Sequence, residues 1–186
     1  LIADSNPELV NFYRSFVDDM DGLIGLYESW PFEERFFYEL RSKKFEELPP
    51  VYAAARTLYL NRACFNGLYR VNRSGGFNVP WGSYKTPFVV DREQFTASRA
   101  ALSNADIRLG DFRSILLESA KPGDFIFLDP PYVPISVNSD FKRYTRDQFY
   151  ERDHHDLADL AKKLAGRGCE LLITNSNHPL VHHLFH

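Results

Sequence analysis

Cysteine is scarce in this chain of 186 residues, which contains only Cys64 and Cys169. Two thiols cannot build a disulfide framework or a four-cysteine zinc site, so a disulfide-rich domain and a domain held by such a zinc site are both excluded. No apolar run approaches the roughly 20 residues that a membrane-spanning helix needs. The segment Leu1–Leu9 also lacks the basic start and apolar core of a secretory signal peptide. These absences predict a soluble, cytoplasmic protein that does not enter a membrane.

Signals for a bound metal and for nucleotide phosphates are missing as well. The 6 histidines have no spacing with cysteines or acids that is typical of a metal site, so no metal is expected. His182 and His183 fall on an expected terminal helix, where an ordinary surface position explains them. No glycine-rich phosphate loop is present. Cys64 lacks the preceding proline of a cytosine-C5 nucleophile, and we expect a buried thiol there.

Positive charge gathers in one part of the chain. The net charge is −3, from 22 basic and 25 acidic residues. Between Val51 and Val90 there is no Asp or Glu, and the basic residues of this segment are Arg56, Arg62, Arg70, Arg73 and Lys85. A basic segment in an acidic chain is typical of a protein that presents one face to phosphate groups. A mostly buried segment that happens to lack acids would show the same composition, so both interpretations stay open here.

Short apolar runs alternate with helical patterns along a chain of globular composition, 44% hydrophobic and 25% charged. Leu1–Asp4 is predicted to be the end of a buried strand. Either Ser5 or Asn6 can cap the helix that begins at Pro7. We expect further helices near residues 31–44, 50–63, 92–103 and 146–166, and further strands at 107–111, 125–128 and 170–175. This alternation predicts an α/β fold with a parallel sheet covered on both faces.

The segment from Phe65 to Tyr84 has a different pattern. Runs at 68–71 and 77–79 flank Gly75-Gly76, which supplies the positive φ angles of a tight turn, so a β-hairpin is expected. We therefore predict a Rossmann-like, mostly parallel sheet domain made of residues 1–20 and 104–186. A lobe of helices and a hairpin (65–85) is inserted into it at residues 21–103.

Three of the expected strands end on an acid, at Asp4, Asp111 and Asp129, and a fourth ends on the amide of Asn175. In an open parallel sheet, ligands bind in the crevice beyond the carboxyl ends of the strands. Acceptors at that edge can bind ribose hydroxyls or the amino group of a base. Any one of these acids alone is explained by a helix cap or a turn, and only their repetition favours a binding site.

The sharpest signal is Asp129-Pro130-Pro131-Tyr132, directly after the apolar run Phe125–Leu128. Two prolines remove two N–H donors and hold the chain extended, while the carbonyl groups stay available as acceptors. An acidic side chain, carbonyls and an aromatic ring suit a planar group that carries an NH₂. Acceptors on both amino protons turn the nitrogen lone pair toward a methyl donor, so methyl transfer needs only positioning and charge complementarity.

Two sequence motifs of the chain resemble those of a known family. Asp-Pro-Pro-Tyr after an apolar strand is similar to the catalytic motif of amino methyltransferases that use S-adenosylmethionine. The segments Asn61–Asn72 and Phe77–Gly82 resemble the target-recognition region of Dam-type DNA adenine-N6 methyltransferases. The resemblance runs from Asp4 to about Asn177. It implies a methyltransferase fold, S-adenosylmethionine as cofactor and double-stranded DNA as substrate, commonly at GATC sites.

The resemblance also implies roles for residues at the edge of the sheet. Asp4 matches the acid that holds the cofactor ribose, and Asp111 with Phe112 matches the pair that contacts the cofactor adenine. The residues that match the pocket for a flipped adenine are Asp129, Pro130, Pro131 and Tyr132. Asp129 borders the cofactor as well.

Further roles concern DNA. Phe65 matches an aromatic wedge in the base stack, with Asn66 beside it, and the residues that match base contacts are Leu68, Arg70 and Pro80. Extruding a base from the duplex costs a few kcal/mol of unstacking and unpairing, and an aromatic wedge can fill the gap left in the base stack. Arg70 can pair with guanine, whereas Arg62, Arg73 and Lys85 are assigned to phosphates. Burial of Phe65 and Leu68 in the core of the hairpin is the alternative.

Two motifs of the family are missing: the glycine-rich loop before the position of Asp4 and a Lys-Trp-x-Gly-Gly-Lys-like segment near the start. We expect that the chain is an excerpt of a longer, monomeric enzyme, with or without a cognate restriction endonuclease. Two other functions stay open. One is an inactive module that binds specific DNA, and the other is an amino methyltransferase for RNA or protein glutamine.

Overall fold

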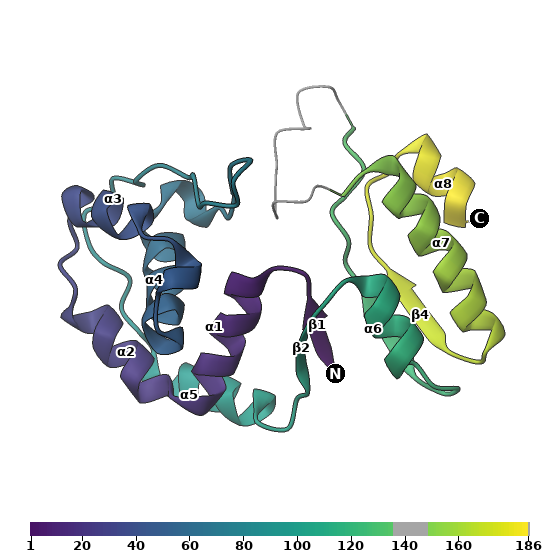
Figure 1. Cartoon of the computed structure of the whole chain (residues 1–186), viewed down its shortest axis with the longest axis horizontal. Coiled ribbons are helices and arrows are strands. Elements are labelled where there is room, and N and C mark those ends of the chain that lie inside the picture. Colours follow the sequence, from purple (N-terminus) through teal and green to yellow (C-terminus); the bar gives the residue numbers. More distant parts are fainter. Residues whose placement is uncertain (136–148, 186) are drawn as a thin grey trace. The chain divides into compact units, whose positions relative to one another are not determined.

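The computed structural model describes residues 1–135 and 149–185. The chain divides into two compact units, Leu1–Gly110 and Asp111–His186. In the first unit a short parallel strand pair adjoins a group of helices, and in the second two helices pack on another parallel strand pair (Figure 1). Among the described residues, no helix is long and apolar enough to span a membrane.

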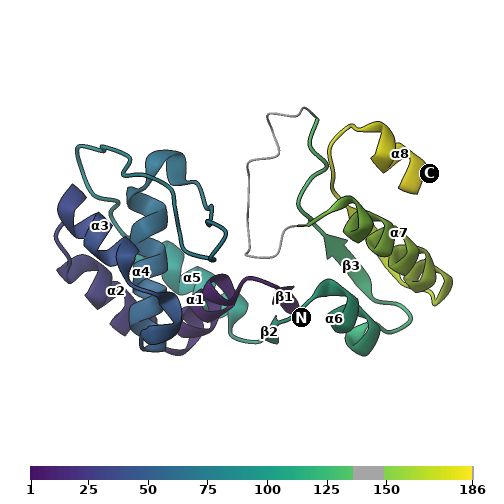
Figure 2. The ribbon, with the colours of Figure 1, turned by 45° about the horizontal axis from the view of Figure 1, so that its top comes forward.

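The first unit contains two strands and five α-helices among its described elements. They are β1 (Ile2–Asp4), α1 (Pro7–Asp18), α2 (Met20–Ser29), α3 (Glu34–Ser42), α4 (Pro50–Ala63), α5 (Arg92–Leu102) and β2 (Ile107–Leu109), with short 3₁₀ turns at Phe45–Glu47 and Phe65–Gly67. Helix α4 packs against α1, α2 and α3 (Figure 2). Its small residues Ala53, Ala54 and Ala55 are fully buried, which lets the neighbouring helices approach closely.

Asn6 caps α1. Its side-chain oxygen accepts the N–H of Glu8 at 3.0 Å and that of Leu9 at 3.4 Å. Of the two cap residues that the sequence allowed, Ser5 and Asn6, the N-cap is therefore Asn6. The Asp4 carboxylate accepts the N–H of Asn6 at 2.7 Å. The strand end and the helix start are therefore linked, and the predicted strand and helix at this point are confirmed. The prediction that this strand is buried is wrong, because Leu1 is 58% and Ile2 38% exposed.

The second unit contains α6 (Phe112–Ser119), β3 (Phe125–Leu128), α7 (Glu151–Gly166), β4 (Glu170–Ile173) and α8 (Pro179–Phe185). Strands β3 and β4 are parallel, with Phe125 opposite Glu170. In the first unit β1 and β2 are parallel too, with Ile2 opposite Ile107. The mixed α/β fold with parallel strand pairs is confirmed.

The prediction that the strands are covered on both faces is wrong for β3. Ile126 and Leu128 pack against Leu160 and Leu164 of α7. Phe125 and Phe127 are 65% and 57% exposed. Successive side chains of a strand point to opposite faces, and within the described part of the chain helices cover only one face of this pair.

Some predicted boundaries differ from those observed. Helix α7 begins at Glu151, not near residue 146, and residues 146–148 of that prediction lie outside the described residues. The sequence patterns did not predict α2 or α6. The predicted hairpin forms no regular ladder; its antiparallel pairing consists of two isolated bridges, Val71 with Phe77 and Cys64 with Trp81.

Candidate active site and nucleic-acid interface

The segment Asp129–Tyr132 follows β3 directly and is exposed at Asp129 and Pro131. The ring of Tyr132 is also exposed, at 51%. No core packing therefore explains these three side chains. This segment, called the corner below, therefore places an acidic residue and an aromatic ring at the surface.

Residues that follow β4 hold this corner at its two ends. The Thr174 hydroxyl donates to the carboxylate of Asp129. At the other end, Asn175 Oδ1 accepts the N–H of Val133 at 3.0 Å, and the Ser176 hydroxyl donates to the Val133 carbonyl at 2.7 Å. The parallel pairing of β3 and β4 places the two strand ends side by side, which makes these bonds possible.

Asp111 and Phe112 lie at the start of α6 in the same unit. Asp111 Oδ1 accepts the N–H of Arg113 at 2.8 Å, which is an N-cap bond, and Oδ2 accepts from Arg113 Nη1 at 2.9 Å. The Arg113 guanidinium also lies 4.4 Å from the ring centre of Phe112. Since each carboxylate oxygen has two lone pairs, Asp111 can accept further hydrogen bonds from a ligand.

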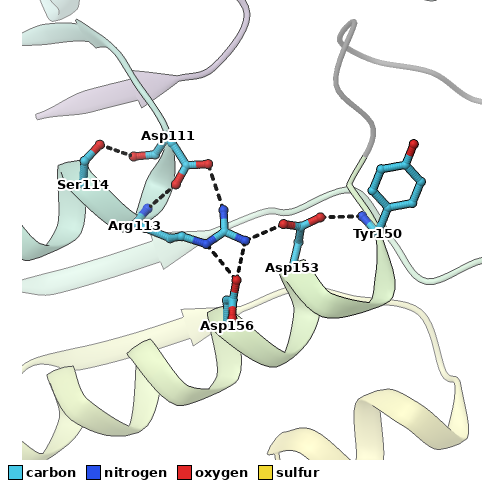
Figure 3. A network of polar contacts seen from close by, with 6 residues as sticks. All are labelled: Asp111, Arg113, Ser114, Tyr150, Asp153 and Asp156. Atoms are coloured by element: carbon cyan, nitrogen blue, oxygen red, sulfur yellow. Dashed lines mark hydrogen bonds and ion pairs between the residues drawn. The ribbon is translucent and has the colours of Figure 1, made fainter.

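Arg113 joins α6 to α7 through two more carboxylates (Figure 3). It donates to Asp153, and its Nη2 lies 2.7 Å from Asp156 Oδ2. Partial burial acts to lower the pKa of Arg113, but the hydrogen bonds to Asp156, Asp153 and Asp111 outweigh it and raise that pKa. The network orients the carboxylate of Asp111 relative to the helix that follows it.

Asp4 lies in the first unit, at the end of β1. It borders a small hollow of about 150 Å³ between β1, α1 and β2, whose lining includes Tyr13 and Ile107. Because ligand pockets usually measure about 300–1,000 Å³, this hollow alone cannot enclose a nucleoside. Asp4 is half-buried, and its carboxylate accepts the N–H of Asn6.

In the first unit, the turn Phe65–Leu68 brings two apolar side chains to the surface. Asn66 has a φ of 54° and Gly67 a φ of 61°. Asn-Gly suits this left-handed turn because both residues tolerate positive φ. Phe65 is 51% exposed and Leu68 47% exposed, so the alternative of a buried hairpin core is wrong for both.

Pro80 lies next to this turn. Its carbonyl accepts the N–H of Phe65 at 2.9 Å. Gly82 is close by, and a Cβ there would lie 2.7 Å from the Cys64 carbonyl oxygen, so glycine is needed at this position. The structure thus brings together three exposed apolar residues for which the sequence predicts DNA contacts: Phe65, Leu68 and Pro80.

The basic residues of the segment 51–90 divide into two groups. Arg56 is 1% exposed and pairs with Glu8, so it adds nothing to a DNA-facing surface. Arg62, Arg73 and Lys85 are exposed, and the Arg62 guanidinium lies 4.2 Å from the ring centre of Phe88. Arg70 is half-buried and bound to Asn78, at 2.7 Å from Nε to the side-chain oxygen.

Cys64 is a buried thiol, as predicted. Its Sγ contacts the carbonyl oxygens of Asn61 and Leu68 at 3.3 Å and 3.2 Å. Burial raises the pKa of Cys64 to about 11, so the thiol is protonated near neutral pH. A thiol in this state is not a nucleophile.

The sequence patterns did not single out Arg113, Thr174 or Ser176. Thr174 and Ser176 flank Asn175, which was noted only as a polar strand end. Their bonds to the segment 128–133 join positions more than forty residues apart, and no local pattern reveals such pairs. The sequence did contain one sign of these contacts. Thr174, Asn175 and Ser176 are three consecutive polar residues at the carboxyl end of β4, the strand beside β3.

The sites belong to an α/β protein that carries acceptors and aromatic rings at the ends of parallel strands, together with an exposed apolar and basic segment. The family model for the D12 class N6 adenine-specific DNA methyltransferases matches residues 1–186. The chain therefore belongs to this family.

Individual relatives agree with this assignment. The chain is 38% identical to a type II methyltransferase, M1.LlaDCHI, of Lactococcus lactis subsp. cremoris, over 100% of the chain and 68% of the relative. It is 35% identical to the type II methyltransferase M.MjaIII of Methanocaldococcus jannaschii, over 95% of the chain and 65% of the relative. A DNA adenine methylase of Vibrio cholerae is also 35% identical, over 98% of the chain and 66% of that protein. The chain thus spans about two thirds of their length.

Proposed function

We propose that the protein transfers a methyl group from S-adenosylmethionine to N6 of an adenine in double-stranded DNA. The observation that carries this proposal is the exposed Asp129–Tyr132 corner, whose carboxylate and far end are held by residues after β4. Membership of an adenine-specific family supports the choice of base. The GATC sequence is the target that we would test first.

The residues at the strand ends suit a nucleoside cofactor in their chemistry. The Asp4 carboxylate can accept from ribose hydroxyls, and Asp111 can accept from an adenine amino group beside the Phe112 ring. The bound cofactor would supply a methyl group activated by a positively charged sulfur. These three residues would bind and orient it.

The catalytic work of the chain is to position the amino group of the target base. Asp129 and the carbonyl of Pro130 would accept its two protons, Pro131 keeps the backbone extended, and Tyr132 would stack on the base. Hydrogen bonds that strengthen as the nitrogen attacks lower the barrier of the transfer. A base inside a duplex cannot reach such a corner, so the base must be flipped out.

The first unit supplies the residues suited to DNA. Phe65 would fill the gap left by the flipped base, with Asn66 in the turn beside it. Leu68, Arg70 and Pro80 would contact base edges, which specify sequence. Arg62, Arg73 and Lys85 would contact phosphates, which position the duplex without reading it.

We further propose that residues 1–20 and 104–186 belong to one Rossmann-like catalytic domain, with 21–103 as an inserted recognition lobe. The protein would act as a monomer, either alone or beside a cognate restriction endonuclease. The names of two relatives as type II methyltransferases support the second possibility.

Transfer of radioactive methyl groups to duplex DNA tests the proposal. The full-length protein should label DNA that contains adenine in its target site, and Asp129→Ala should abolish the label. Asp159→Ala is the matched control, because Asp159 is an exposed acid on α7. Undiminished labelling by Asp129→Ala would reject the role of the corner. DNA binding without cofactor binding in calorimetry would favour an inactive DNA-binding module, and labelling of RNA alone would favour an RNA enzyme.

A further inference from the structure

The corner after β3 depends on outside contacts for its shape. Pro130 and Pro131 have no N–H, so neither can donate a backbone hydrogen bond that would hold the segment. The bonds at its ends come instead from three consecutive residues after β4: Thr174, Asn175 and Ser176. Each binds a different atom of the segment 129–133.

Thr174 acts at the end that carries the acid. Its N–H donates to the Leu128 carbonyl at 3.0 Å, which continues the β3–β4 pairing by one residue. Its hydroxyl donates to Asp129 Oδ1, while the Leu128 carbonyl lies 3.5 Å from the same hydroxyl. Since a hydroxyl has a single proton, the nearer carboxylate is its main acceptor.

Asn175 and Ser176 act at the other end. Asn175 Oδ1 accepts two N–H groups, those of Val133 and Ser176, at 3.0 Å and 2.9 Å. Val133 is buried, at 7% exposed, and its carbonyl accepts from the Ser176 hydroxyl. At this end the side chains of Asn175 and Ser176 bind backbone atoms of Val133. At the other end the Thr174 hydroxyl binds the side chain of Asp129.

We propose that Thr174 is a positioning residue for methyl transfer, which acts by orienting the carboxylate of Asp129. This inference rests on the proposed function. Asp129 is exposed, and an exposed acid samples several rotamers unless a partner holds it. With Oδ1 bound to Thr174, the carboxylate has one orientation. Oδ2, which accepts no hydrogen bond from the described residues, remains for the amino group of the base.

The test compares two substitutions in the full-length protein. Thr174→Val keeps the shape and removes the hydroxyl, and Thr174→Ser keeps the hydroxyl. We expect Thr174→Val to lower the single-turnover methylation rate about 10- to 100-fold, as misplacement of a reacting group does. The KM values for DNA and cofactor should stay within about threefold, because only orientation in the transition state is lost. Thr174→Ser should restore the rate to within about threefold of the wild type.

Thr96→Val is the matched control. Its hydroxyl donates to the Arg92 carbonyl at 2.7 Å inside α5, far in sequence from the corner, so its loss should leave the rate unchanged. Circular dichroism checks that each variant is folded. If Thr174→Val does not fold, Thr174→Ala compared with Thr174→Ser decides in the same way.

The outcomes separate the two proposals. A wild-type protein that methylates no DNA contradicts the proposed function itself. An active wild type with an equally active Thr174→Val variant overturns the inference alone. So does an equal loss in Thr174→Val and Thr174→Ser, because a role of the hydroxyl requires rescue by serine.

Discussion

Arg70 and Asn78 lie next to the Val71–Phe77 bridge and are joined by three hydrogen bonds, one of which runs from the Asn78 N–H to the Arg70 carbonyl at 2.9 Å. Arg70 Nε donates to the side-chain oxygen of Asn78 at 2.7 Å, and Nη2 donates to its carbonyl at 3.2 Å. Arginine has five N–H donors in a planar fork, so the edge formed by Nη1 and the second proton of Nη2 is left to face a ligand. Asn78 thereby orients the guanidinium of Arg70.

Loss of this support should weaken the discrimination for guanine. Asn78→Leu removes the side-chain acceptor, so Arg70 must lose rotamer freedom when DNA binds. We expect a preference for guanine over other bases that is about tenfold weaker, since one bidentate contact provides about 1–3 kcal/mol. The measurement is kcat/KM on duplexes with single replacements in the target site. Asn104→Leu, at an exposed position, is the control, and an unchanged preference in Asn78→Leu would contradict the prediction.

Phe65 and Phe77 provide a matched pair of substitutions in one hairpin segment. Phe65 is 51% exposed and Phe77 is 5% exposed. Phe65→Ala should leave thermal stability nearly unchanged and reduce methylation of duplex DNA more than that of single strands, because only a duplex requires base extrusion. Phe77→Ala should instead destabilise the protein by about 3–5 kcal/mol through loss of core packing. Equal rate losses on both forms of DNA in Phe65→Ala would contradict a wedge role.

The ion pair of Arg56 and Glu8 should matter for folding rather than for DNA. Arg56 Nη1 lies 3.3 Å from Glu8 Oε2, and the two side chains are 2% and 8% exposed. Glu8→Ala leaves a buried cation without its partner and should cost about 3–5 kcal/mol of unfolding free energy. Glu39→Ala breaks the exposed pair with Arg35 and should change stability little. Urea unfolding of both variants measures the difference.

His154 should make the stability of the protein sensitive to acid. The ring is buried at 4% exposed, its Nδ1 has no hydrogen-bond partner among the described residues, and it packs edge-on against Phe149. Burial lowers the pKa of His154 below its ordinary value of 6.5, although Asp153 and Glu151 act in the opposite direction. The unfolded chain therefore takes up this proton first. The contribution of the neutral His154 ring to the unfolding free energy is therefore complete above about pH 6.5. This contribution is lost as the pH falls below that value.

The variant His154→Leu tests this pH dependence. Between pH 7 and pH 5 its unfolding free energy should fall less steeply than that of the wild type, by at most about 1.4 kcal/mol per pH unit. His155→Leu is the matched control, since the neighbouring His155 is 49% exposed at its side chain. Identical pH profiles for the wild type and His154→Leu would show that the buried imidazole does not titrate differently on folding.

Much of the molecule follows from local sequence. Strand β1, the cap and start of α1, helix α4 and the parallel strands were predictable, because capping residues and apolar runs specify them within a few residues. The position of Asp129–Tyr132 directly after β3 was predictable too, because the apolar run Phe125–Leu128 marks the strand. Helix α2 was missed. It contains two glycines, Gly22 and Gly25, so its intrinsic propensity is poor, and contacts with α4 supply much of its stability.

The sequence by itself determined which chemical groups stand at the strand ends: acids, two imino acids and an aromatic ring. Only the tertiary structure decided how those groups are held. It showed that Arg56 is neutralised inside the first unit, that Phe65 and Leu68 are exposed, and that Thr174 binds Asp129. The physical reason is that hydrogen bonds and burial depend on which distant segments become neighbours. That pairing is set by the packing of the whole domain rather than by the residues on either side.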